Sequence, residues 1–183
     1  MRHTSVRSLS FASVATLIIL AAPRAQAGNA APLGFELGVA TRAQVRARLD
    51  PVTSLEDRGT NRFSTGPMLG GNGAGLGVEG LQKITFIFDS AEVLQGVLMT
   101  LPKDFKPTFE RLQKKYALVA KQVPFVGNTW ARFSQGTSLI TLDAPHLSFE
   151  MTLEYLSQSL MAAFKRESER DKKRREEEQG SRL

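Results

Sequence analysis

The segment "LSFEMTLEY", residues 147–155, decides the fold class of this chain. Apolar and polar side chains alternate along all of it, and a period of two predicts a β-strand with one buried and one solvated face. The apolar series comprises Leu147, Phe149, Met151, Leu153 and Tyr155. A single strand is not stable alone, so the rest of the sheet must come from the flanking sequence.

Two hairpins supply these neighbours. The first joins "LQKITFIFD" (81–89) to "VLQGVLMTL" (93–101) through a turn at "DSAE". The second joins "NTWARFS" (128–134) to "TSLITLD" (137–143) through a turn at "QG". Both pairs are rich in β-branched, aromatic and other apolar residues and are bounded by turn residues, as antiparallel hairpins require.

Helices are expected between and around the strands. Thr41 with Gln44 three residues later is a capping box, so a short helix begins there and ends before Pro51. A second apolar stripe at helical spacing consists of Phe105, Phe109, Leu112 and Tyr116. A third, closing the domain, consists of Leu156, Leu160 and Phe164.

These elements predict an α+β fold with an antiparallel sheet of about five to six strands. Two short helices pack on one face of the sheet, and a C-terminal helix follows. We expect a single domain over 28–163, interrupted by a flexible loop at 66–80, where seven of fifteen residues are glycine. The charged tail, 164–183, is expected to be either a solvated helix or disordered.

The opening "LGFELGVATRAQVRARL" resembles the G-x-x-x-x-x-x-V-x-x-x-L start of small bacterial envelope domains. Its matching residues are Gly38, Thr41, Val45 and Leu49, and the hairpin "ITFIFDSAEVLQGVLMTL" is similar to the one that follows in such domains. Examples are the small lipoprotein of the outer-membrane barrel assembly machine and the repeats of secreted β-lactamase inhibitor proteins. The resemblance implies an architecture of helix-plus-hairpin units and implies no functional residue.

Residues 1–27 read as a secretory signal peptide. Arg2 and Arg7 precede an apolar run at 11–22, and "AQA" ending at Ala27 is a cleavage site. The run is shorter than the ~20 residues that a membrane-spanning helix needs. We therefore expect cleavage near Ala27 and a periplasmic or secreted protein. The chain has no cysteine, which excludes a lipidated N-terminal cysteine, disulfides and thiolate chemistry.

The formal net charge of +6 does not describe the folded body. Three arginines lie in the signal peptide, and eight basic residues against six acidic ones lie in the tail. Thirteen basic and twelve acidic residues remain for the body, so we expect no nucleic-acid partner. The four consecutive cations at 172–175 leave weak membrane contact through the 165–183 tail as the one membrane hypothesis.

No catalytic signature emerges. The run at 75–80 matches G-x-G-x-x-G, but no helix pattern follows it, so a connector is the better interpretation. His146 is the only histidine after the signal peptide and, with Asp143, is too little for a zinc site; a surface loop is expected. We therefore predict no enzyme activity, no catalytic residue, no metal and no cofactor.

Binding is the remaining function class, with an envelope protein as the expected partner. Trp130 and Arg132 share one face of a strand and are residue types enriched in binding hot spots, although a tryptophan is more often a core residue, which favours a core position for Trp130. Glu150 and Glu154 share the polar face of the last strand, about 13 Å apart. Two glycine-segment side chains complete the candidate set, Leu69 and Leu76. Alternatives are a carboxylate-dependent hydrolase of an envelope polymer and a secreted inhibitor or chaperone-like protein.

Overall fold

A computed structural model describes residues 28–180 of the chain. The predicted signal peptide and its cleavage site lie outside the described residues. The fold is α+β, with eight antiparallel strands in the order β1-β2-β3-β4-β8-β7-β6-β5. The strands are β1 Leu55–Thr60, β2 Thr65–Asn72, β3 Lys83–Asp89, β4 Leu94–Pro102, β5 Ala117–Gln122, β6 Thr129–Gln135, β7 Ser138–Ala144 and β8 Glu150–Ser157. The helices are η1 Pro32–Gly34, α1 Arg42–Leu49, α2 Phe105–Lys115 and α3 Gln158–Gly180.

The strand order divides the sheet into two similar halves. In each half a short helix, α1 or α2, is followed by four strands that each pair with the next. The halves join where β4 pairs with β8, in a register that runs from Gly96 opposite Leu156 to Pro102 opposite Glu150. The alternation of helices and hairpins in the sequence therefore corresponds to two units fused edge to edge into one sheet.

One face of this sheet is covered and carries the core. A continuous row of opposed side chains crosses six strands there, and each member is at most 6% exposed: Leu69, Phe86, Val97, Tyr155, Ile140 and Phe133. Phe35 of the N-terminal segment packs edge-on against Phe86, with ring centroids 6.2 Å apart, and Phe109 of α2 lies 5.6 Å from Phe133. We call the other side the open face.

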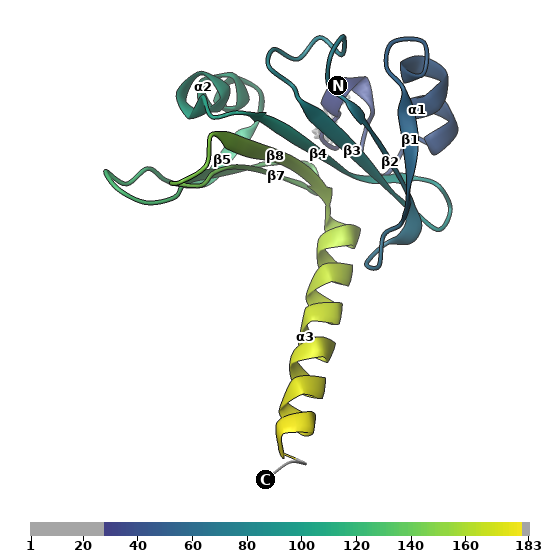
Figure 1. Ribbon diagram of the computed structural model, residues 1–183, viewed down its shortest axis with the longest axis vertical. Helices are drawn as coiled ribbons and strands as arrows, with labels where there is room; N and C mark the ends of the chain where they lie inside the picture. The colour runs from purple at the N-terminus through teal and green to yellow at the C-terminus, as the bar shows by residue number, and fades with distance from the viewer. Residues whose placement is uncertain (1–27, 181–183) are drawn as a thin grey trace, which may run out of the picture.

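The helices α2 and α3 lie on opposite sides of the sheet (Figure 1). Only the first turns of α3 touch the sheet, where Leu160 lies over Gly96 on the open face; a Cβ at Gly96 would stand 3.0 Å from the Leu160 side chain. Farther along α3, Glu167 and Asp171 pair with Arg62 of the β1–β2 turn, and the helix runs on away from the sheet (Figure 1). Among residues 28–180, no helix is long and apolar enough to cross a membrane.

Several predicted elements are confirmed. The capping box at the start of α1 is complete, since the Thr41 hydroxyl accepts from the Gln44 amide and the Gln44 side chain accepts from the Thr41 amide. The helix predicted from Phe105 and both predicted hairpins are present. Of the two expectations for the tail, the helix is the one observed as far as Gly180.

The predicted count of five to six strands was too low, because three of the eight strands lack the alternation of buried and exposed residues that marks a strand in the sequence. The loop prediction for 66–80 fails over 66–72, which belongs to β2. Glycine is needed there because β3 approaches closely: a Cβ at Gly66 would clash with the Asp89 carbonyl oxygen of β3. The edge strands β1 and β5 are mostly exposed, so no buried alternation marks them.

The strand predicted over 147–155 is present as β8, but the prediction began three residues too early. β8 starts at Glu150, and Leu147 and Phe149 are 93% and 94% exposed in the preceding loop. Leu156, assigned to the closing helix, is instead in β8, and α3 begins at Gln158. The hydroxyl of Ser157 caps α3 by accepting from the Leu160 amide, 3.1 Å away.

Candidate functional site

The open face brings together four of the six predicted binding residues. In one row of cross-strand partners, Arg132 of β6 lies opposite Thr141 of β7, and Thr141 lies opposite Glu154 of β8. In the neighbouring row, Trp130 lies opposite Asp143. The two rows are adjacent because these residues alternate along β6, β7 and β8. The polar series of "LSFEMTLEY" thus lies on the side of the sheet that α1 and α2 leave uncovered.

Trp130 is half-buried on this open face, so the core interpretation of it was wrong. The guanidinium carbon of Arg132 lies 5.0 Å from the centre of the Trp130 ring, a cation–π arrangement. Arg132 itself is exposed. Flat aromatic and cationic surface of this kind is typical of protein-binding hot spots.

Glu154 is the acid with an unusual environment. Burial raises the pKa of its carboxyl above the ordinary value, and the negative charge of Asp143 raises it further. Within residues 28–180, no hydrogen bond or ion pair reaches the Glu154 carboxylate. Glu150, by contrast, is exposed at the very start of β8. The acid nearest in the sheet to Glu154 is therefore Asp143 on β7, and not Glu150.

Glu154 borders an apolar groove of about 250 Å³ between the open face and α3. We call this the α3 groove. Its lining consists of Asn61, Phe63, Ile87, Leu98, Glu154, Leu156, Leu160, Met161 and Phe164. Sequence reasoning missed the groove, although one signal was present. The segment "VLQGVLMTL" is apolar on both strand faces, which indicates that Leu98 also has a partly covered surface.

The glycine-segment candidates are not part of this surface. Leu69 is fully buried on the covered face and is unavailable to a partner. Leu76 lies in the turn after β2 and packs partly buried against the core. The G-x-G-x-x-G match lies in this turn, and strand β3 follows it, so the helix that a dinucleotide site requires is absent there.

His146 lies in the exposed loop between β7 and β8, as predicted. Its ring Nδ1 accepts from the Gly127 amide at 3.4 Å, and its own amide donates to the Asn128 side chain at 2.9 Å. Within the described part of the chain, no three His, Cys, Asp or Glu residues converge as metal ligands would. The contacts of His146 therefore tie two loops together.

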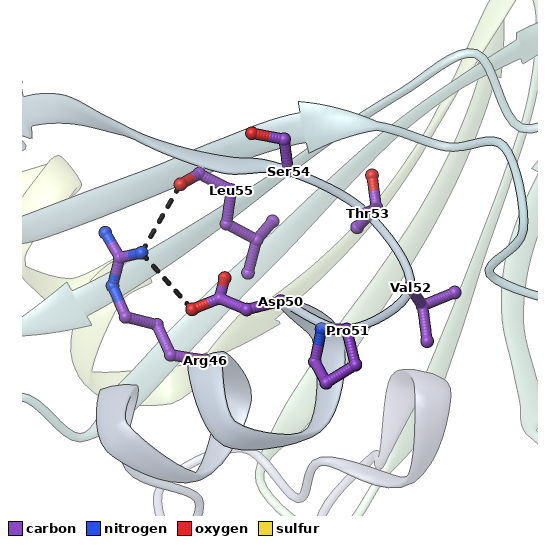
Figure 2. Close-up of a pocket in the computed structure, with 7 residues that line it drawn as sticks. All are labelled: Arg46, Asp50, Pro51, Val52, Thr53, Ser54 and Leu55. Carbon is purple, nitrogen blue, oxygen red and sulfur yellow. Dashed lines mark hydrogen bonds and ion pairs between the residues drawn. The ribbon is translucent and has the colours of Figure 1, made fainter.

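A second hollow, of about 350 Å³, lies beside α1 and is polar (Figure 2). Arg46 dominates it, donating to the Leu55 carbonyl at 3.3 Å and pairing with Asp50 at 3.6 Å and Asp57 at 3.1 Å. The Thr53 hydroxyl donates to the Asn72 carbonyl. Because Arg46, Asp50 and Thr53 already have partners within the fold, this hollow holds α1 to β1 and offers little to a ligand.

Three of the four consecutive cations at 172–175 form ion pairs within α3. Lys172 and Lys173 pair with Glu176 and Glu177 one turn later, and Arg174 pairs with Asp171 at 2.7 Å. Such intrahelical pairs stabilise an exposed helix modestly. They also lower the positive charge that this segment presents to an anionic surface.

Comparison with known proteins identifies no family: no family model, no curated protein and no solved structure matches the chain. The resemblance to small envelope domains therefore holds at the coarser level of an α+β domain with an antiparallel sheet.

Proposed function

We propose that this chain is an exported, non-enzymatic binding or accessory protein of the bacterial periplasm or cell envelope. Its binding surface is the open face of the sheet, centred on Trp130, Arg132 and Glu154. Export rests on the signal-peptide pattern of residues 1–27. The binding role rests on the uncovered side of the sheet, whose other side holds the core.

The observation that carries the proposal is the unpaired Glu154 carboxyl on a face that also presents the Trp130–Arg132 stack. A half-buried acid without a partner costs folding free energy, and such groups concentrate at functional sites. The surrounding face combines apolar, aromatic and charged surface, which a protein or ligand can cover with matching contacts.

The resemblance to helix-plus-hairpin envelope domains supports the same proposal in a finer form. Two units, each a helix followed by four strands, build one broad sheet in this chain. A sheet of that size with one free face suits an inhibitor or chaperone-like protein that holds another protein across its strands. We assign no membrane role to α3, because most of its cations at 172–175 are paired within the helix.

One observation favours a second candidate function, hydrolysis of an envelope polymer. Asp143 and Glu154 form an acid pair in which one carboxyl has a raised pKa, the condition a general acid needs. The pair lies on an open sheet beside a groove of about 250 Å³ and not in a deep cleft, so binding remains the preferred function. Loss of polymer hydrolysis in both Asp143→Asn and Glu154→Gln variants, from a measurable wild-type rate, would favour the enzyme.

The proposed function is tested by comparing partner recovery from envelope extract among variants of one tagged protein. Trp130→Ala and Arg132→Glu should each abolish recovery of the specific partner. Lys106→Glu is the matched charge-reversal control, because Lys106 is exposed on α2, on the opposite side of the sheet. Equal recovery with all variants contradicts the proposal, and N-terminal sequencing of the exported protein, expected to begin at Gly28, tests the export.

A further inference from the structure

The α3 groove is enclosed by two segments far apart in sequence. The turn between β1 and β2 reaches across to α3, where the Phe63 and Phe164 rings meet edge-on with centroids 5.0 Å apart. Beside them, Arg62 pairs with Glu167 at 3.1 Å and with Asp171 at 2.9 Å. These contacts hold α3 beside the open face, so that the groove is part of the folded structure and needs no closure around a ligand.

The floor of the groove is apolar and its border is acidic. Leu98 lies directly opposite Glu154 across the β4–β8 pair, and Leu156 follows two residues later on the same face. Leu160 and Met161 form the α3 wall. The Glu154 carboxylate is the one acid in this lining, and it has no hydrogen-bond or ion-pair partner within residues 28–180.

The charges around Glu154 favour a cation. Asp143 on the neighbouring strand β7 adds a second negative charge, close enough to raise the pKa of the Glu154 carboxyl. Arg132 lies two strands from Glu154 in the same row of the face, but its guanidinium lies over the Trp130 ring and does not pair with either acid. The site therefore combines an apolar groove with an uncompensated negative border.

We propose that the α3 groove binds a small amphiphile of the primary alkylammonium class, with its aliphatic chain along Leu98 and Leu156 and its ammonium on Glu154. This assignment deepens the proposed function and rests on it, since the groove opens on the same face. A volume of about 250 Å³ is below the usual range of drug-sized pockets and fits one short chain. An alkyl carboxylate meets two like charges there, and an alcohol leaves the acid without a cation.

The test titrates the purified protein with n-octylammonium chloride below its micellar concentration, using calorimetry and NMR shifts of the groove methyl groups. We expect octylammonium to bind about tenfold or more tightly than n-octanol, as a charged hydrogen bond provides. Octanoate and methylammonium, which each lack one of the two required features, should bind far more weakly. No shift at Leu98 or Leu156 with octylammonium would overturn the assignment.

Two variants separate the contribution of the Glu154 carboxylate from that of the apolar groove. Glu154→Gln should remove the preference for octylammonium over octanol, whereas Glu150→Gln, on the same strand and outside the lining, should leave it intact. Leu98→Trp should fill the groove and abolish binding of both octylammonium and octanol. An unchanged circular dichroism spectrum would show that the fold persists. Unchanged octylammonium affinity in Glu154→Gln overturns the assignment.

The two proposals fail separately. If octylammonium does not bind while Trp130→Ala still abolishes partner recovery, the ligand class is wrong and the binding face stands. If octylammonium binds as expected while partner recovery is the same in every variant, the groove is a ligand site and the protein-binding face is wrong.

Discussion

Phe63 and Phe164 meet edge-on with ring centroids 5.0 Å apart, although strands β2 to β8 lie between them in the sequence. Phe63 belongs to the turn between the first two strands, and Phe164 to the second turn of α3. Edge-to-face aromatic pairs are worth about 0.5–1.5 kcal/mol beyond the area they bury. This contact and the ion pairs of Arg62 hold α3 to the β1–β2 turn, in addition to the packing of Leu160 over Gly96.

Removal of this contact should free the start of α3. We expect Phe63→Ala to lower the free energy of unfolding by about 1 kcal/mol and to speed protease cleavage within 161–170. Urea denaturation and limited proteolysis measure the two effects. Phe125→Ala is the control, because Phe125 is fully exposed in a loop; it should change the free energy of unfolding by no more than about 0.5 kcal/mol and leave the cleavage rate unchanged. An equal loss in both variants contradicts the role of the contact.

The raised pKa of Glu154 gives stability a definite pH dependence. A carboxyl whose folded pKa exceeds its unfolded value of about 4.3 stabilises fully below that value and loses this contribution as pH rises through the folded pKa. Glu154→Gln should therefore gain stability relative to wild type as the pH rises above about 4. Melting temperatures measured across this range provide the test.

The matched control for this pH effect is Glu150→Gln, on the same strand but exposed. Its melting temperature should follow that of the wild type at every pH. A constant offset between Glu154→Gln and wild type would show that the Glu154 pKa is the same in the folded and unfolded states.

The sole tryptophan reports directly on the open face. Because Trp130 is half-buried under Arg132, its fluorescence should be quenched by acrylamide more than a core indole and less than a free one. Arg132→Ala should raise the quenching constant by uncovering the ring. Full protection from acrylamide in both proteins would place Trp130 in the core after all.

Leu69 should behave as a core residue and not as a binding residue. Leu69→Ala leaves a cavity on the covered face and should cost about 2–5 kcal/mol of unfolding free energy. Leu76→Ala, in the partly exposed turn after β2, should cost about 1 kcal/mol or less. Equal effects in chemical denaturation would contradict the placement of Leu69 in β2.

The Thr41 capping box should account for a measurable part of the stability of α1. Thr41→Ala removes the acceptor for the Gln44 amide and should cost about 1 kcal/mol, while Thr41→Ser keeps the hydroxyl and should cost much less. Denaturant titration of both variants provides the measurement. The serine variant losing as much as the alanine variant would show that the cap is not responsible.

Local pattern was enough for the elements that bury one face. Strict alternation located the interior of β8, and the residues Thr41 and Gln44 located the start of α1, because both signals act over a few adjacent residues. The glycine-rich β2 carried no such signal. Its assignment depends on the close approach of β3 at Gly66, which is a contact between distant segments.

The sequence by itself determined the fold class, the main hairpins and the candidates Trp130, Arg132 and Glu154, since each follows from periodicity and side-chain chemistry along one segment. Only the tertiary structure decided which side of the sheet is open and that Glu154 borders a groove. The pairing of β4 with β8 and the packing of α3 beside Phe63 create both features. Contacts between residues far apart in the chain depend on how the two halves of the sheet join, and no local pattern encodes that junction.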